Sequence, residues 1–271
     1  MATDIRVLYA DLDGTLLGPG GSLFATPGGL TPRGAEALAR VHASGVSLVL
    51  VSGRTREQMR EAGRILHADA SVAELGALLV ERDAFFTETA VANYGEYTGE
   101  ATPFEAMARS GAGGFLLERY AGRLEPHTPW TFQDREATML FRGLIDPAEA
   151  TVALAEAGYT WLEILDNGVI RRTYPTLDVA EVRAYHLVPR GVNKASGVKL
   201  HRDRHGLSVE EAAAVGDSLS DAQMAGVVGR TFIVGGGEPA LQEARPENVT
   251  ILDEPGGDGV ARAVDLLLGE G

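Results

Sequence analysis

Short apolar runs alternate with segments of helical pattern in the first and last thirds of this 271-residue chain. Two runs, residues 5–10 and 46–51, are almost entirely apolar, as expected for strands buried on both faces of a sheet. Between them lies a helical segment that Thr31-Pro32 opens and Gly45 ends. This alternation predicts an α/β fold whose core is a Rossmann-like, doubly wound parallel sheet.

The same pattern continues along both ends of the chain. It predicts a helix over 55–66 and a third strand over 73–80. The last third predicts helices over 193–205, 221–227, 239–244 and 259–268, and strands over 212–215, 231–234 and 249–252. We therefore expect residues 1–83 and 188–271 to form one catalytic core.

The middle of the chain, residues 84–187, follows a different pattern. Strands are expected over 137–142 and 182–188, with a helix over 147–157 between them. Asn167-Gly168 separates two further strand-like runs, which is a strong hairpin signal. This stretch is therefore expected to be an inserted α+β cap domain with an antiparallel sheet.

The composition excludes several classes of function. Acidic residues outnumber basic ones by 38 to 24, so nucleic acid and anionic membranes are poor partners. No apolar run reaches the roughly 18 residues of a membrane helix, and the N-terminus lacks a secretory signal pattern. Without cysteine there are no disulfides, thiolate metal sites or thiol nucleophiles. We expect a cytoplasmic protein whose oligomeric state the sequence leaves open.

Polar clusters follow the predicted core strands. Residues 11–15 (DLDGT) follow the first strand, and residues 52–54 (SGR) follow the second. Lys194 begins a late helix, and the pair Asp217 and Asp221 follows a late strand. Ligands of open α/β sheets bind beyond the carboxyl ends of the strands, so we expect these groups at one edge.

Four carboxylates in one crevice require a cation. Repulsion among Asp11, Asp13, Asp217 and Asp221 would raise their pKa values unless positive charge neutralised them. A site of oxygen ligands favours Mg²⁺ over zinc, and Mg²⁺ commonly bridges carboxylates to a phosphate. Lys194 adds a fixed positive charge, so the cluster predicts a site for a phosphoryl group.

The spacing Asp-x-Asp allows the two carboxylates to take different chemical roles. One carboxylate attacks phosphorus, and the second protonates the leaving oxygen and then activates water. Each cluster taken alone has a simpler interpretation: Asp-x-Asp-Gly can be a turn, and Asp217 and Asp221 can be acids at a helix N-terminus. Lys194 can be solvated, with Lys199 as the functional lysine. The order of all four clusters favours catalysis.

These clusters resemble the motifs of the haloacid-dehalogenase-like (HAD) phosphohydrolase superfamily. The matching segments are DLDGTL at 11–16, VSGRT at 51–55, GVNKASGVKL around Lys194 and GDSLSD at 216–221. The middle of the chain resembles the C2 cap of the Cof-type subfamily, subclass IIB, whose relatives include sugar phosphatases, sucrose-phosphate phosphatase and mannosyl-phosphoglycerate phosphatase.

The resemblance implies a role for each matching residue. Asp11 would be the nucleophile, Asp13 the general acid and base, and Lys194 a further catalytic group. The Mg²⁺ ligands would be Asp11, Asp13 through its carbonyl, Asp217 and Asp221. The groups for the substrate and its phosphate would be Thr15, Ser52, Gly53, Arg54 and Lys194. The chain departs from the subfamily pattern at Ser220, where Asn is usual, and at Leu75, where an Asn-Gly pair is typical.

The sequence thus predicts Mg²⁺-dependent hydrolysis of a small phosphomonoester, with a phosphorylated sugar as the expected substrate. A phosphomutase of the same fold and a non-catalytic sugar-phosphate sensor are the alternatives. The cap would select the leaving group. Its candidate contacts, each more often structural than functional, are His127, Trp130, Arg135, Arg171, Arg172 and His186.

Overall fold

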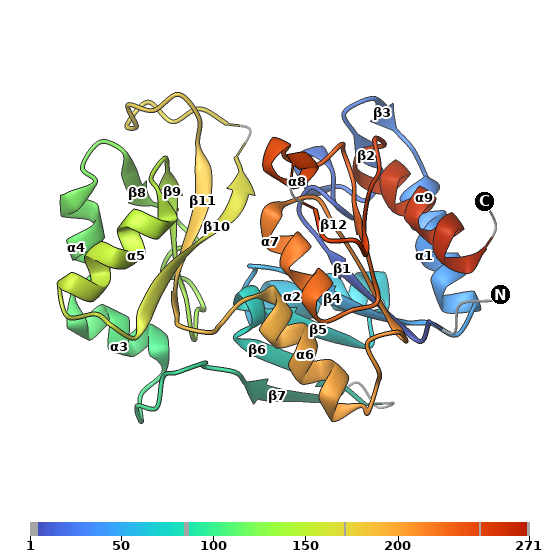
Figure 1. Ribbon diagram of the computed structural model, residues 1–271, viewed down its shortest axis with the longest axis horizontal. Coiled ribbons are helices and arrows are strands. Elements are labelled where there is room, and N and C mark those ends of the chain that lie inside the picture. The colour runs from blue at the N-terminus through green and yellow to red at the C-terminus, as the bar shows by residue number, and fades with distance from the viewer. Residues whose placement is uncertain (1–4, 84–86, 171, 244, 270–271) are drawn as a thin grey trace. The chain divides into compact units, whose positions relative to one another are not determined.

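The computed structural model describes residues 5–83, 87–170, 172–243 and 245–269, and the chain forms two compact units (Figure 1). The first unit comprises Met1–Val91 and Lys194–Gly271, and the second comprises Ala92–Asn193. The divisions fall a few residues beyond those expected at 83 and 188. Strand β7 (Glu88–Ala92) belongs to the sheet of the first unit, and β11 (Arg183–Pro189) extends the second unit.

The first unit is built on one long sheet with the order β14-β13-β12-β1-β4-β5-β6-β7. Its other strands are β1 (Val7–Asp11), β4 (Ser47–Val51), β5 (Ala70–Ala73), β6 (Leu78–Arg82), β12 (Ala212–Gly216), β13 (Arg230–Ile233) and β14 (Val249–Ile251). The strands from β14 to β5 are parallel, and β6 runs antiparallel to β5. The expected α/β fold is confirmed.

Helices cover both faces of this sheet (Figure 1). They are α1 (Arg33–Ala43), α2 (Arg56–Leu66), α6 (Lys194–Arg204), α7 (Leu219–Ala222), α8 (Pro239–Glu243) and α9 (Gly256–Leu268). Alternate strand residues such as Tyr9 and Val49 pack with Val198 of α6 on one face. Helices α1 and α9 pack together on the other, where a Cβ at Gly34 would lie 3.0 Å from Gly257 Cα. Both faces are therefore buried, as the apolar strands predict.

The prediction of one strand over 73–80 is wrong. A tight turn over Glu74–Gly76 divides it into β5 and β6, which pair antiparallel. Glu74 and Leu75 have φ values of 48° and 58°, which side chains other than glycine rarely adopt. Their amides donate to the carbonyls of Arg54 and Ser52, so the strained turn is tied to the loop after β4.

The second unit has an antiparallel sheet with the order β10-β11-β9-β8. Its elements are α3 (Pro103–Ser110), α4 (Ala112–Arg119), β8 (Leu124–Pro126), β9 (Met139–Gly143), α5 (Pro147–Glu156), β10 (Leu162–Val169) and β11. Side chains from α3, α4 and α5 bury Phe141, Ile164 and Tyr185 on one face of the sheet. The expected antiparallel sheet is confirmed.

The prediction of a hairpin turn at Asn167-Gly168 is wrong. Both residues lie inside β10, where the pairing with β11 shifts register between Asp166 and Val169. Gly168 has a φ of 98°, and its amide donates to the Asp166 carboxylate at 2.8 Å. Asn-Gly therefore forms a β-bulge rather than a turn, because the favoured left-handed geometry serves both.

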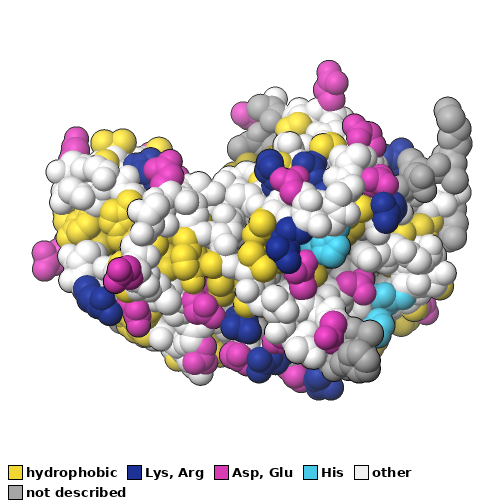
Figure 2. Space-filling model, turned by 90° about the horizontal axis from the view of Figure 1, so that it is seen from below, with side chains coloured by type: hydrophobic (Ala, Val, Ile, Leu, Met, Phe, Trp, Pro, Cys, Tyr) yellow, Lys and Arg dark blue, Asp and Glu magenta, His cyan; other side chains and the backbone are white. Residues whose placement is uncertain are grey.

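Two further expectations from the sequence concern membrane helices and surface charge. Within the described ranges, no helix combines the length and apolar character needed to cross a membrane. Acidic and basic side chains are interspersed on the face that Figure 2 shows. The glycine-rich segment over 18–30, which follows the loop after β1, contains the short antiparallel strands β2 (Ala25–Thr26) and β3 (Gly29–Leu30).

Candidate active site

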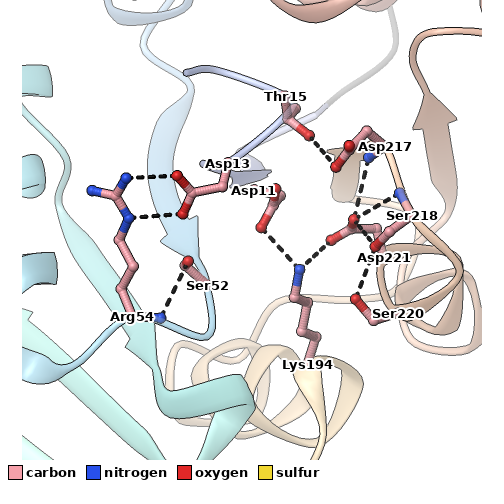
Figure 3. Close-up of polar contacts among 10 residues, drawn as sticks. All are labelled: Asp11, Asp13, Thr15, Ser52, Arg54, Lys194, Asp217, Ser218, Ser220 and Asp221. Carbon is pink, nitrogen blue, oxygen red and sulfur yellow. Dashed lines mark hydrogen bonds and ion pairs between the residues drawn. The ribbon is translucent and has the colours of Figure 1, made fainter. Parts of the chain in front are cut away.

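The loops that follow β1, β4 and β12 leave the sheet at the same edge (Figure 3). Strand β1 lies between the other two: Asp11 is opposite Val51 of β4, and Ala10 is opposite Val215 of β12. The residues just beyond these strand ends therefore meet, although the loop after β12 is about 200 positions from the loop after β1 along the chain.

Lys194, the first residue of α6, holds two of these loops together. Its Nζ donates to Asp11 Oδ1 at 2.8 Å and to Asp221 Oδ1 at 2.7 Å, and its side chain is only 3% exposed. Burial disfavours the ammonium, but the two adjacent carboxylates outweigh it and raise the pKa of Lys194. Lys199 instead lies on the surface, paired with Asp203. The structure thus brings Lys194, and not Lys199, into the cluster.

Three carboxylates share this one lysine. Oxygens of Asp11, Asp217 and Asp221 all lie within 4.8 Å of one another. Burial raises the pKa of Asp11 well above its ordinary value, and the neighbouring Asp221 and Asp217 add to the effect although Lys194 opposes it. Burial and Asp221 raise the pKa of Asp217 to about 7. The cluster carries more negative charge than the lysine balances.

This donor set fits a divalent cation. The three carboxylates offer only oxygen atoms, which Mg²⁺ prefers, and a bound cation would restore their ionised forms. Gly14 lets the loop after β1 approach them: its φ is 94°, and a Cβ there would lie 2.1 Å from Asp217 Oδ2. Thr15 Oγ1 donates to Asp217 Oδ1 at 3.2 Å, which fixes the carboxylate against the same loop.

Asp221 is anchored from its other oxygen. Its Oδ2 accepts from the Ser218 hydroxyl at 2.6 Å and from the amides of Ser218 and Asp217. The sequence-based prediction omitted Ser218, although Ser-x-x-Asp at a helix start is a capping-box signal. Ser220, which replaces the usual Asn, reaches the Ser218 hydroxyl at 2.9 Å. Hydroxyl and amide groups therefore orient the Asp221 carboxylate.

Asp13 lies apart from the three clustered carboxylates. Its side chain is 57% exposed and accepts two hydrogen bonds from Arg54, at 2.8 Å from Nε and 2.6 Å from Nη2. Arg54 was expected to bind phosphate, but here its Nε and Nη2 both donate to Asp13. A two-point contact of this kind fixes the orientation of a carboxylate. Arg54 thus orients the group expected to act as acid and base.

Ser52 and Gly53 are both buried at the end of β4. Ser52 Oγ accepts from the Arg54 amide at 3.3 Å, while its backbone is bound on both sides by the segment from Val72 to Leu75. Backbone hydrogen bonds therefore fix the loop after β4 at the same end of the sheet as Asp11.

The residues of the second unit that were expected as candidate substrate contacts lie partly in its core and partly on its surface. Arg135 is buried and donates to the Trp130 carbonyl and the Thr138 hydroxyl, which is a structural arrangement. His186 is buried in β11, and burial lowers the pKa of His127 to about 4. Arg172 lies over the ring of Tyr174. Arg171 lies outside the described residues.

Part of the chain is similar in sequence to known hydrolases. Residues 173–264 match the family model described as haloacid dehalogenase-like hydrolase. A phosphoglycolate phosphatase from Halobacterium salinarum is 33% identical over 84 residues, which cover 31% of this chain and 36% of that protein. The chain therefore matches about a third of the length of this curated relative.

Solved structures resemble nearly the whole chain. A haloacid dehalogenase-like hydrolase from Bacteroides thetaiotaomicron has a TM-score of 0.64 at 16% identity, covering 97% of this chain and 99% of that one. The sucrose-phosphatase from Synechocystis sp. PCC6803, in complex with sucrose and phosphate, has a TM-score of 0.64 at 14% identity, covering 98% of both chains. The resemblance to the haloacid dehalogenase-like superfamily is confirmed in fold and in the segment that contains Lys194, Asp217 and Asp221.

Proposed function

We propose that this chain is a Mg²⁺-dependent phosphomonoester hydrolase that acts on a small phosphorylated metabolite through an aspartyl-phosphate. The observation that carries the proposal is the close grouping of Asp11, Asp217 and Asp221 at the buried ammonium of Lys194, which bonds to Asp11 and Asp221. A structural ion-pair network would balance its charges, whereas this one leaves an excess that suits a cation and a phosphate.

Asp11, Asp217 and Asp221 would hold the Mg²⁺, together with the carbonyl of Asp13. When bound, the ion supplies positive charge to the ionised carboxylates and to the phosphoryl oxygens. Lys194, the Ser52 hydroxyl and the amides of the loops bind the remaining phosphoryl charge.

The covalent chemistry follows from the positions of the two aspartates after β1. An Asp11 oxygen attacks phosphorus while the bond to the ester oxygen breaks, and Asp13 gives its proton to that leaving oxygen. Asp13 then takes a proton from water, whose oxygen attacks the same phosphorus and releases the Asp11 carboxylate. Arg54 acts as a positioning residue, because its two hydrogen bonds aim the Asp13 carboxyl group.

The proposed substrate class is phosphorylated sugars and their derivatives. Similarity in fold to a sucrose-phosphatase supports this class. The curated relative acts on phosphoglycolate, as its name says, so short acid phosphates are included in the test. We assign the choice of leaving group to the inserted unit, in line with the domain division expected at 84–187.

The decisive experiment measures phosphate release from a panel of sugar phosphates, phosphoglycolate and an aryl phosphate. The wild-type protein is assayed with Mg²⁺ and with chelator, and Asp11→Asn is assayed with Mg²⁺. We expect turnover that disappears with chelator and falls to the detection limit in Asp11→Asn. Asp203→Asn, which neutralises an exposed aspartate of α6, serves as the matched control and should retain full activity.

Two results would refute the proposal. One is phosphate release that persists in Asp11→Asn, which would remove the nucleophile from the mechanism. The other is the absence of release from every compound by folded, Mg²⁺-loaded protein. A requirement for a bisphosphate activator would indicate a phosphomutase instead.

A further inference from the structure

A second group of potential metal ligands lies in the first unit, away from the aspartate cluster. Glu81 extends from β6, His201 lies in the last turns of α6, and His205 follows the end of that helix. One ring nitrogen of each histidine and a carboxylate oxygen of Glu81 lie within 4.8 Å of one another. Two histidines four residues apart lie on the same side of a helix, which suits joint ligation.

His201 is held as a metal-binding histidine usually is. Its ring is 5% exposed, and its Nδ1 lies 2.9 Å from the hydroxyl of the fully buried Tyr9. Ligating imidazoles are commonly oriented by a hydrogen bond at their second nitrogen. With Nδ1 engaged by Tyr9, Nε2 is the nitrogen open to a cation. Burial lowers the pKa of His201 to about 4, so the ring is neutral at ordinary pH.

His205 and Glu81 complete the group from the surface. His205 Nε2 lies 2.8 Å from Glu81 Oε1, and Arg204 donates to the other carboxylate oxygen at 2.9 Å. Burial alone would raise the pKa of Glu81, but the hydrogen bonds from Arg204 and His205 outweigh it and lower the pKa. The carboxylate is therefore ionised. One of its oxygens is held by Arg204, and the other faces the histidines.

We propose that Glu81, His201 and His205 form a second metal site, for a borderline cation such as Zn²⁺. Two imidazole nitrogens and one carboxylate oxygen are a typical zinc set with a free fourth position, and they do not suit Mg²⁺. The donor chemistry thus separates this site from the all-oxygen cluster of Asp11, Asp217 and Asp221.

The spacing permits closure on an ion. Ligand atoms about 2.0–2.1 Å from a tetrahedral zinc lie roughly 3.3 Å apart. The atoms that lie farthest apart must therefore approach by about 1.5 Å at most, and His205 Nε2 and Glu81 Oε1, now 2.8 Å apart, must separate by about 0.5 Å. His205 can make this adjustment because its side chain is 49% exposed, and its ring already contacts that of His201, with centroids 4.4 Å apart.

Metal at this position would join β6 to the end of α6, and His201 would connect it to β1 through Tyr9. Glu81 belongs to β6 and both histidines to the end of α6, while Tyr9 lies on β1, two residues before Asp11. The ion would therefore fasten the helix that begins with Lys194 to the sheet. It would act on stability and leave the chemical step to the other cluster.

Zinc binding is measured with Zn²⁺ itself, by calorimetric titration of metal-free protein in saturating Mg²⁺. We expect the wild-type chain to take up one Zn²⁺. His205→Gln and Glu81→Gln should weaken this binding by at least about tenfold, and Tyr9→Phe by about tenfold through the lost orientation of His201. Zn²⁺ should raise the melting temperature of the wild type but not of His205→Gln.

Two controls make the outcome unambiguous. His67→Asn removes another exposed histidine, at a left-handed position with a φ of 54° that asparagine tolerates, and should bind Zn²⁺ like the wild type. Asp217→Asn should also retain the zinc site. Equal binding by wild type, His205→Gln and Glu81→Gln would overturn the proposal. So would loss of zinc in Asp217→Asn alone, which would assign the ion to the aspartate cluster.

Discussion

The charged side chains of the two units are organised in opposite ways. In the second unit several arginines pair directly with a carboxylate, as Arg142 does with Glu125 and Arg183 with Asp166, at 2.6 and 2.5 Å. At the sheet edge of the first unit, three carboxylates share only Lys194. Pairs of opposite charge balance one another on a protein surface, whereas carboxylates that lack enough positive charge indicate a site that binds a cation. The imbalance therefore supports the proposal that this cluster is the active site.

Removing one cation from each unit gives the largest contrast. Lys194→Gln should reduce kcat by about 10³-fold, because the transition-state charge loses a buried donor. Arg119→Gln removes a comparable charge from the exposed pair with Glu149, and should leave kcat and the melting temperature nearly unchanged. Steady-state kinetics and thermal unfolding measure both variants. Equal effects in the two variants would contradict the distinction drawn between the units.

Asp13→Asn should reduce kcat by about 10²-fold on alkyl phosphates, because the leaving oxygen loses its proton donor. An aryl phosphate, whose leaving group needs less protonation, should suffer a smaller loss in the first chemical step. A comparison of single-turnover rates on the two substrates tests this. The same reduction on both substrates would remove Asp13 from the role of acid.

Arg54→Gln should reduce kcat by about tenfold with little change in KM, because Asp13 loses its orientation while the phosphate contacts remain. The pH profile of kcat should shift as well, since the charged partner of Asp13 is gone. Arg54→Lys should restore part of the rate. An increase in KM with kcat unchanged would instead support the expectation that Arg54 binds the phosphate.

The smallest effect concerns stability without metal. The raised pKa of Asp217, about 7, means that this group stabilises the fold below pH 4 and that this contribution is lost as pH rises from about 4 to about 7. Asp217→Asn should therefore raise the melting temperature of the metal-free protein at pH 8 by roughly 2–4 °C. Mg²⁺ should stabilise the wild type and not the variant, as measured by thermal unfolding with and without chelator. A variant that melts below the wild type at pH 8 would contradict the assigned pKa.

The sequence predicted the convergence at the sheet edge because the relevant residues occupy fixed positions after parallel strands. Asp11 ends β1, and Asp217 follows β12 directly, so strand register alone brings them together. Lys194 at the start of a helix was predictable for a similar reason, since helix starts and strand ends share one edge of such a sheet.

Other features depend on tertiary contacts that residue types do not reveal. Nothing in the local sequence indicates that Arg54 would turn to Asp13. The turn at Glu74 and Leu75 uses positive φ values that local preferences oppose, and hydrogen bonds to the loop after β4 maintain it. Helices α3 and α4 are only eight residues each and meet at Gly111, so their periodicity is too short to stand out.

The ion pair between Lys194 and Asp11 joins positions 183 residues apart. Strand β1 can pair early with β4, but its other edge must wait for β12, which follows the whole second unit in the chain. A growing chain therefore presents an open, largely apolar strand edge for most of its synthesis, a form prone to pairing with other chains. Long-range closure of this kind is slow. The step that removes the hazard also assembles the carboxylates, so a chain that has not finished folding has no active site.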